Sequence, residues 1–369
     1  MEFLVIPAKG DVRNLLGLGL EERGTKMLAA AGLQAASGIF GDGPLVLYPG
    51  ERVGPGALGK EIAAINVAGP EVFAAIGLLA GDTSGDGIGR PVLLVGAQKR
   101  AALLAGILTP DDAYRLAASG VTDTRTLQTP TILVTDQASR DYARSMLLKA
   151  LRKPIDGLVS RTLNRPVSIA VSSIIVATPL TPNHLSVICF LLALGAAGLM
   201  VSGHFVLGAV LMHVSSVLDG CDGEVARLKY QSSKLGGWLD TVFDDISNNV
   251  FALSTGIGLY LIRGGDWFGT LLLILAAIGF VMAVPVAYAT YRRMIQTGHS
   301  DSGAIDWSGG RQASGWRRFF TTWLAPLVKR DAYLFAFLLM AIAQVPEAIV
   351  VFYAIGSVGA VGTMLTDPG

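Results

Sequence analysis

The stretch LDGCDGEVARLKYQSSKLGGWLDTVFDD, residues 218–245, sets several carboxylates between two long hydrophobic runs. The chain around it has 369 residues, of which 51% are hydrophobic and only 15% are charged. Soluble domains carry about 25% charged residues, so this composition favours a membrane protein. A charged side chain near the centre of a membrane helix costs about 2.5–3.5 kcal/mol. Acids in this setting therefore require a positive partner, such as a bound cation.

Hydrophobic runs long enough to cross a bilayer begin after residue 180. A membrane helix needs about 20 consecutive apolar residues. The candidate spans are 184–201, 204–220, 237–262, 268–290, 331–346 and 347–365. We therefore expect an all-α membrane domain over residues 151–369, with six transmembrane helices between residues 184 and 365. Pro179 and Pro182 predict a sharp turn into the first span.

The basic residues between these spans are unevenly distributed. Most follow the second and fourth spans: Arg227, Lys229, Lys234, Arg292, Arg293, Arg311, Arg317, Arg318, Lys329 and Arg330. The other connections between spans contain only Arg263. Because basic loops remain in the cytoplasm, this distribution predicts a multi-pass protein of the cell membrane. The N-terminal half and the acidic stretch would both lie on the cytoplasmic side.

Residues 1–150 follow a different pattern. Short apolar runs such as EFLVIPA and RPVLLVGA are bounded by Gly, Pro and Asp and are separated by helix-like segments. Buried strands that alternate with helices predict a soluble α/β domain with a mostly parallel sheet. The N-terminus has no basic segment before a long apolar core, so we expect no cleaved signal peptide.

The connection between the two halves, residues 140–180, mixes basic and apolar residues. Its basic residues are Arg140, Arg144, Lys149, Arg152, Lys153, Arg161 and Arg165. At helical spacing this pattern predicts an amphipathic juxtamembrane helix that contacts the membrane lipids of the cytoplasmic leaflet. A solvated linker helix is the alternative interpretation.

Charge and cysteine content exclude two classes of function. The net charge is +1, and no basic tract carries interleaved aromatic residues, so nucleic acid is not an expected partner. The two cysteines, Cys189 and Cys221, lack paired spacing. We therefore expect neither a disulfide framework nor a zinc site.

The acids of the opening stretch fall at helical spacing. Asp219 and Asp222 are three residues apart, and Asp240 and Asp244 are four apart, so each pair shares one helix face. Two helices that meet at an elbow would direct both pairs to one point. Ligands that are all oxygen favour magnesium, manganese or calcium. The alternative is a plain charged elbow in which the acids pair with the nearby Arg227, Lys229 and Lys234.

Written out, the pattern is D-x-x-D-G-x-x-A-R, eight further residues, and G-x-x-x-D-x-x-x-D. The residues that fill it are Asp219, Asp222, Gly223, Ala226, Arg227, Gly236, Asp240 and Asp244. This pattern resembles the signature of the CDP-alcohol phosphotransferase family. Membership implies a six-helix membrane fold, usually a homodimer. Such enzymes transfer a phosphate-linked alcohol from a CDP-alcohol to an acceptor hydroxyl and release CMP.

The resemblance also implies roles for single residues. Asp219, Asp222, Asp240 and Asp244 would hold one or two Mg²⁺ or Mn²⁺ ions, and Asp244 would also be the catalytic base. The CDP-binding residues would be Asn183, Gly223, Ala226, Arg227, Ser233 and Gly236. A surplus of cytoplasmic cations indicates an acceptor with a phosphate group or an anionic lipid surface, although membrane topology alone accounts for it equally well. The candidate acceptor-binding residues are Arg161, Arg165, Arg292 and Lys329. Two further acids, Glu224 and Asp245, lie outside the pattern and are expected to be solvated or paired with lysine.

The segment KPIDGLVSRTLNRPVS and the later TPLTPN resemble the junction in bifunctional inositol-phosphate cytidylyltransferase / di-myo-inositol phosphate phosphate synthases. These fuse a nucleotidyltransferase domain to a CDP-alcohol phosphotransferase domain. An active nucleotidyltransferase has a loop similar to A-G-x-G-x-R after its first strand. The segment AKGDVRN keeps one glycine but lacks the second, and has Val12 where the loop needs a residue without a side chain. Arg13 and Arg23 are the residues left to contact a phosphate. We therefore expect residues 1–150 to be a degenerate nucleotidyltransferase-like domain that folds alone and does not bind CTP.

The expected function is that of a membrane enzyme of phospholipid or polyol-phosphate diester synthesis. The acceptor is open among a polyol, a polyol phosphate and a lipid. One alternative is a synthase of a soluble product whose N-terminal domain is an active cytidylyltransferase. From other classes, a membrane-anchored scaffold with a vestigial site and an ion transporter are the alternatives, since acids inside a membrane often mark ion paths.

Overall fold

The computed structural model describes residues 2–6, 15–16, 18–36, 45–49, 52–53, 55–65, 72–77, 92–96, 110–119, 121–127, 132–134, 136–152, 156–297 and 329–366. The chain forms two compact units. The first, which we call the α/β unit, contains Met1–Arg152, Ser173–Pro179 and Glu224–Gln231. The second, the helical unit, contains Lys153–Ser172, Leu180–Gly223 and Ser232–Gly369.

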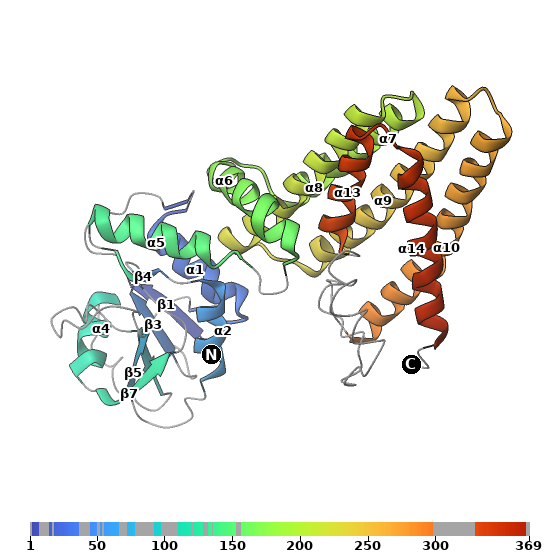
Figure 1. Ribbon diagram of the computed structural model, residues 1–369. Helices are drawn as coiled ribbons and strands as arrows, with labels where there is room; N and C mark the ends of the chain where they lie inside the picture. The colour runs from blue at the N-terminus through green and yellow to red at the C-terminus, as the bar shows by residue number, and fades with distance from the viewer. Residues whose placement is uncertain are drawn as a thin grey trace. The chain divides into compact units, whose positions relative to one another are not determined.

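The α/β unit is built on a six-stranded sheet (Figure 1). In spatial order its strands are β2 (Gln34–Ala35), β1 (Glu2–Ile6), β3 (Leu45–Pro49), β6 (Val92–Val95), β5 (Val72–Gly77) and β7 (Val121–Leu127). A separate two-stranded sheet pairs β4 (Arg52–Val53) with β8 (Ile132–Leu133). The helices of this unit are α1 (Leu20–Ala30), α2 (Gly56–Ala64), α4 (Pro110–Ser119) and α5 (Gln137–Lys149).

The large sheet is mixed: three of the five pairings between its described strands are parallel, in line with the expected mostly parallel sheet, and two are antiparallel. Strand β1 is parallel to β2 and β3, and β5 is parallel to β7. Strand β6, however, is antiparallel to both of its neighbours, β3 and β5. A buried apolar run such as Val92–Val95 gives the burial of a strand but not its direction, which depends on the connections on either side.

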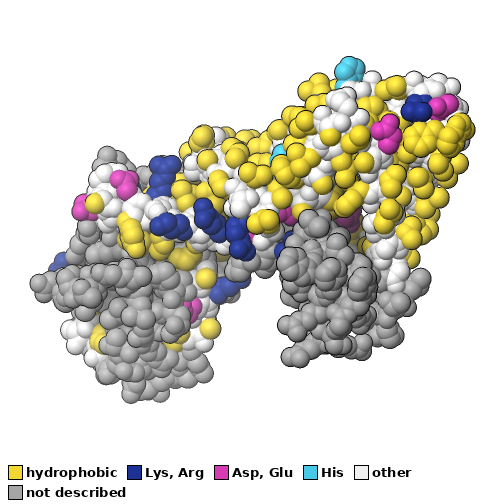
Figure 2. Space-filling model, viewed as in Figure 1, with side chains coloured by type: hydrophobic (Ala, Val, Ile, Leu, Met, Phe, Trp, Pro, Cys, Tyr) yellow, Lys and Arg dark blue, Asp and Glu magenta, His cyan; other side chains and the backbone are white. Residues whose placement is uncertain are grey.

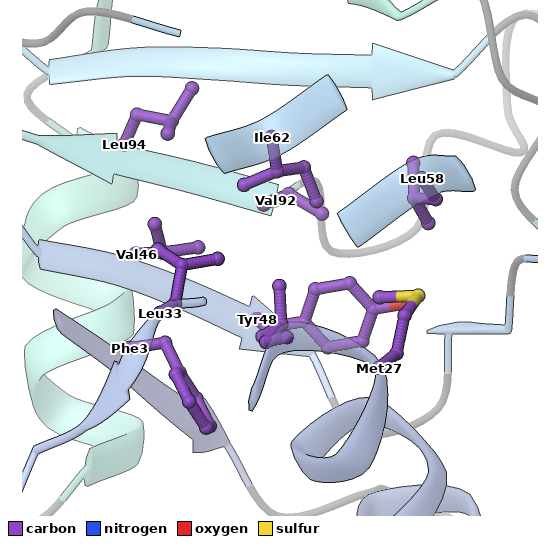
Figure 3. Packing of buried hydrophobic residues seen from close by; sticks show 10 residues of the cluster. Phe3, Met27, Leu33, Val46, Tyr48, Leu58, Ile62, Val92 and Leu94 are labelled. Atoms are coloured by element: carbon purple, nitrogen blue, oxygen red, sulfur yellow. The ribbon is translucent and has the colours of Figure 1, made fainter. Parts of the chain in front are cut away.

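One hydrophobic core joins the helices α1 and α2 to the sheet (Figure 3). Phe3, Tyr48 and Leu94 contribute from the strands, and Met27 and Leu58 contribute from the helices. All of these side chains are almost fully buried, and each one of this size stabilises the fold by about 1.5–3 kcal/mol. The expectation of buried strands covered by helices is therefore met in the described part of residues 1–150.

The helical unit contains a helix at each of the six expected spans. They are α7 (Pro182–Val201), α8 (Phe205–Leu228), α9 (Lys234–Ile262), α10 (Trp267–Thr297), α13 (Arg330–Ile342) and α14 (Glu347–Thr366). Helix α8 continues to Leu228 rather than ending near residue 220, because residues 219–228 have no helix breaker except single glycines. The elbow between α8 and α9 therefore lies at residues 229–233, after the first pair of acids.

Three of these helices, α7, α8 and α10, are long and apolar enough to cross a membrane by length and composition. Helix α14 has a shorter apolar stretch, Glu347–Gly362. Hydrophobic side chains cover much of the described surface of the helical unit in the view of Figure 2. Leu191 and Ile355 are examples, with exposures of 60% and 68%. Exposed apolar surface on this scale fits contact with lipid, and the chain is a membrane protein.

Small residues let these helices approach each other closely. A side chain at Gly258 of α9 would collide with the backbone of Met200 in α7, and one at Gly256 would collide with Ala276 of α10. Small residues at such crossings are typical of helix packing in membranes. Helix α9 is thereby held between α7 and α10, which fixes the position of its acids.

Two short helices lie in the stretch before α7: η1 (Ser160–Asn164) and α6 (Arg165–Ile175). Val167 and Ile174 of α6, and Leu158 just before η1, are large apolar side chains with exposures of 52%, 71% and 73%. Arg161, on the same segment, is also exposed. The combination of exposed apolar groups and a cation is the pattern expected of a helix at a membrane surface.

Candidate active site

Three aspartates, two from α8 and one from α9, lie close together in the helical unit. Carboxylate oxygens of Asp219, Asp222 and Asp240 all lie within 4.8 Å of one another. Oxygens bound to one divalent ion at about 2.0–2.6 Å would lie up to about 4–5 Å apart across the ion, so this spacing fits a single shared cation. Because all the donors are carboxylates, the set suits a hard divalent cation.

The fourth acid of the motif, Asp244, is joined to this cluster by an arginine. Arg330, the first residue of α13, donates from Nη1 to Oδ2 of Asp219 at 2.7 Å and to Oδ2 of Asp244. The three side chains are mostly buried, with exposures of 18–24%. The guanidinium provides positive charge between acids that would otherwise repel one another. In the sequence, Arg330 is only one of several cations in the connection between two spans.

Asp222 is the most enclosed of the clustered acids, with 8% exposure. Ser186 of α7 donates its hydroxyl to Oδ2 of Asp222, and the Gly223 N–H donates to Oδ1. Such outer hydrogen bonds orient a carboxylate toward a bound ion. Ser186 was missed from sequence, although it lies one helical turn after Asn183, which was selected.

The structure brings several of the predicted CDP-binding residues together. A side chain at Gly236 would lie 3.2 Å from Oδ1 of Asn183 and 3.1 Å from Oγ of Ser233. The start of α7 therefore lies against the start of α9, with glycine at the point of contact. Ser233 is the N-cap of α9, since its Oγ accepts the Gly236 N–H at 3.0 Å. This gives Ser233 a structural role that the sequence argument did not consider.

Gly223, Ala226 and Arg227 follow the first two acids on the same helix, α8. Gly223 directly follows Asp222, and Ala226 and Arg227 lie in the last turn of α8. The Nη2 atom of Arg227 donates to the carbonyl oxygen of Leu151 at 3.4 Å. Their grouping on one helix end follows from the continuation of α8 to Leu228.

The predicted acceptor-binding residues differ in their surroundings. Arg165 forms a two-pronged ion pair with Asp156, with both nitrogen–oxygen distances at 2.9 Å. The pair is largely buried, so Arg165 is committed to holding the start of α6. Arg161, Arg292 and Lys329 are exposed, and Lys329 directly precedes Arg330.

The sequence predicts that the two acids outside the motif are solvated or paired with a lysine. Asp245 accepts a hydrogen bond from the Tyr291 hydroxyl at 2.8 Å, so its partner in this contact is a tyrosine. It also lines a cavity of about 250 Å³ together with Asn248 and Tyr353. Glu224 is fully buried, so the expectation of a solvated side chain is wrong.

Arg23 was one of the two residues left to contact a phosphate, and the structure excludes this role for it. Its side chain is 1% exposed, and its guanidinium donates to the carbonyl oxygens of Leu15, Leu16 and Leu228. The other candidate, Arg13, lies outside the described residues, as does Val12.

Comparison with known proteins points to the same part of the chain as the cluster of aspartates does. Residues 179–358, which include all four aspartates of the motif, match the CDP-alcohol phosphatidyltransferase family. This part of the chain is a CDP-alcohol phosphatidyltransferase domain. The resemblance seen in the sequence is thus confirmed, and a divalent-metal cluster of three aspartates fits the chemistry of CDP-alcohol phosphatidyltransferases.

Curated relatives share the same region. The chain is 38% identical over 153 residues to "Bifunctional IPC transferase and DIPP synthase" of Aquifex aeolicus, which is 41% of this chain and 34% of that protein. It is 33% identical over 79 residues to "Archaetidylinositol phosphate synthase" of Pyrococcus horikoshii, or 21% of this chain and 42% of that protein. "Phosphatidylinositol phosphate synthase" of Corynebacterium glutamicum is 31% identical over 111 residues, or 30% of this chain and 50% of that protein. The match thus spans about a third of the first of these relatives.

Proposed function

We propose that this protein transfers a phospho-alcohol group from a CDP-alcohol to an acceptor hydroxyl and releases CMP. The observation that carries the proposal is the group of three carboxylates within 4.8 Å, together with the arginine that links one of them to Asp244. Acids collected at one point of an apolar bundle are unfavourable unless they bind a cation. Transfer of a pyrophosphate-linked group is a reaction in which a cation at this point is useful.

Asp219, Asp222, Asp240 and Asp244 would hold one or two Mg²⁺ or Mn²⁺ ions. Such ions offset the negative charge that develops on the bridging and leaving oxygens of a pyrophosphate. Ser186 and the Gly223 N–H keep Asp222 in a fixed orientation for this task.

Asp244 would take the proton of the acceptor hydroxyl. The hydroxyl oxygen then forms a bond to the phosphorus that carries the donor's alcohol, and the bond from that phosphorus to CMP breaks. In the structure, the Arg330 guanidinium forms an ion pair with the Asp244 carboxylate. We infer that Arg330 moves onto the substrate phosphates as the site fills, because its planar fork suits phosphate oxygens as well as carboxylates. That movement would leave Asp244 free to act as the base.

The acceptor would itself be a phosphorylated polyol. Arg161, Arg292 and Lys329 are exposed cations on segments around the acidic cluster, and Arg330 lies next to the last of them. The relatives from Pyrococcus and Corynebacterium are named archaetidylinositol phosphate synthase and phosphatidylinositol phosphate synthase. A CDP-linked lipid and CDP-inositol would both bind as donors through the same residues. The donor alcohol is therefore the part of the reaction that a substrate panel must identify.

We further propose that all six helices of the helical unit cross the membrane of the cell and that two chains pair as a homodimer. The acidic cluster and the α/β unit would face the cytoplasm, as the basic connections require. Exposed Leu158, Val167 and Ile174 would rest on the lipid surface beside them. The α/β unit would be a nucleotidyltransferase-like domain without that activity.

The test is CMP release by the full-length protein in detergent, followed over a panel of CDP-alcohols and acceptors, with products identified by mass spectrometry. We expect release that needs both substrates and Mg²⁺ or Mn²⁺, and that stops when the metal is chelated. A membrane scaffold or an ion transporter would give no CMP. Metal-independent release would equally overturn the proposal.

A further inference from the structure

The C-terminal end of α8 is closed by a Schellman motif. The Gln231 N–H donates to the carbonyl oxygen of Ala226 at 2.8 Å, and the Tyr230 N–H donates to that of Arg227 at 3.4 Å. Tyr230 is left-handed, with a φ of 54°. A residue other than glycine pays roughly 1–2 kcal/mol for this conformation, so its neighbours must hold the turn in place.

Arg23 of α1 is the neighbour that completes this helix end. Its Nη1 atom donates to the carbonyl oxygen of Leu228, the last residue of α8, at 3.1 Å. That carbonyl has no partner within the helix, and a cation is favoured at the negative end of the helix dipole. The Nη2 atom donates to Leu15 at 2.7 Å and to Leu16 at 3.2 Å. One buried guanidinium therefore joins the start of the α/β unit to the end of α8.

Tyr230 adds an apolar contact at the same place. The Arg23 guanidinium lies over its ring, 5.6 Å from the ring centre. The ring also packs against the core cluster that contains Met27 and Leu58. Next to it, the Lys229 ammonium donates to the carbonyl oxygen of Thr178 at 2.7 Å. The last turn of α8 and the residues after it are thus part of the α/β unit, in agreement with the assignment of Glu224–Gln231 to that unit.

We propose that Arg23 is a positioning residue for the CDP half of the active site, and that the α/β unit serves the transferase by holding the end of α8. This inference rests on the proposed function, because Ala226 and Arg227 are candidate CDP contacts. Their carbonyl oxygens accept the two bonds of the Schellman motif, so a loosened helix end displaces both residues. Arg23 acts through α8 and does not touch the substrate. The α/β unit then has a role that needs no nucleotidyl transfer.

Hydrogen exchange of the full-length protein in detergent tests the clamp without any substrate. The variant Arg23→Met keeps much of the apolar stem and removes the guanidinium. We expect the amides of Tyr230 and Gln231 to exchange at least about tenfold faster, the effect of losing a hydrogen bond from a charged donor. Peptides from Pro182–Val201 should not change. Lys26→Met is the matched control, since Lys26 lies one turn along α1 and pairs at the surface with Glu22.

Kinetics then separate positioning from general damage. Arg23→Met should raise the KM for the CDP-alcohol about tenfold and leave the acceptor KM unchanged, because the lost bond holds only the donor side. Arg23→Lys keeps the charge and should restore part of the donor affinity; it also serves as the test if Arg23→Met folds poorly. Unchanged exchange at the end of α8, or equal increases in both KM values, would overturn the inference. If the wild type released no CMP, the proposed function would fail, and the exchange result would still decide the clamp.

Discussion

The two units bury charge in opposite ways. In the helical unit, carboxylates from α8 and α9 are brought together until a cation is required, and Arg330 reaches them from α13. In the α/β unit, the buried cation Arg23 is surrounded by carbonyl oxygens and a tyrosine ring. The first arrangement leaves charged oxygens directed at a shared point, which a ligand can use. The second bonds both Nη atoms of the guanidinium to fixed backbone carbonyl oxygens, which favours a structural role.

The largest effect should come from the acidic cluster itself. We expect Asp222→Asn to reduce CMP release by roughly a thousandfold, the size seen when a preorganised charge-stabilising group is lost. The change removes a charge but keeps the shape, so the detergent-solubilised protein should elute and melt as the wild type does. CMP release and thermal melting measure the two quantities.

Asp245→Asn is the matched control, because Asp245 is an adjacent acid of α9 whose carboxylate accepts from Tyr291 rather than joining the cluster. It should keep most of its activity. An essential Asp245 beside a dispensable Asp222 would move the metal site to the other side of α9.

A smaller effect should follow from removing the arginine that links the acids. In Arg330→Met the acids lose a positive charge that competes with the ion, so we expect Mn²⁺ to bind about tenfold more tightly in the absence of substrate. A unit charge at about 4 Å contributes about 1–4 kcal/mol at effective dielectric constants between about 80 and 20. Turnover should nevertheless fall, because the phosphates lose their arginine. Free Mn²⁺ measured by electron paramagnetic resonance reports the binding.

Lys329→Met controls for this experiment, since it removes the neighbouring charge and keeps the guanidinium of Arg330. It should leave Mn²⁺ affinity near that of the wild type. Weaker Mn²⁺ binding in Arg330→Met would mean that the arginine supports the acids rather than competing with the ion.

The exposed cations should affect one substrate only. Lys329→Gln and Arg292→Gln should each raise the acceptor KM by up to about tenfold, as expected for a lost charged hydrogen bond to phosphate, and leave the donor KM unchanged. Arg263→Gln is the control, because Arg263 caps the other end of α9 and pairs with Asp266. Equal changes in both KM values would indicate a defect in folding or insertion instead.

Local spacing explains what the sequence could predict of this site. The i,i+3 and i,i+4 intervals of the acids place them on helix faces wherever the helices go, and the helix α7 was expected to within two residues of its observed start. Long apolar runs likewise predicted a helix at each of the six positions. Such features depend on residues near one another in the chain.

Contacts between distant segments could not be predicted in this way. Arg330 is 86 residues from Asp244, and Arg23 is 205 residues from Leu228. Among many basic residues in a connecting loop, nothing in the spacing distinguishes the one that reaches the acids. The direction of β6 and the burial of Glu224 are of the same kind, since both depend on how separate elements pack.

The smallest expected effect concerns nucleotide binding by the α/β unit. We predict no binding of CTP with Mg²⁺ in isothermal titration of full-length Asp222→Asn, in which the metal cluster of the helical unit is disabled. The full chain is required because Glu224–Gln231 belongs to the α/β unit, so residues 1–150 alone would lack Tyr230. The physical reason is twofold. The loop AKGDVRN lacks the glycines that let backbone amides surround a triphosphate, and Arg23 is already bonded to three carbonyl oxygens. Micromolar binding, or pyrophosphate release with a polyol phosphate, would restore an active cytidylyltransferase and make the two units a pair of consecutive enzymes.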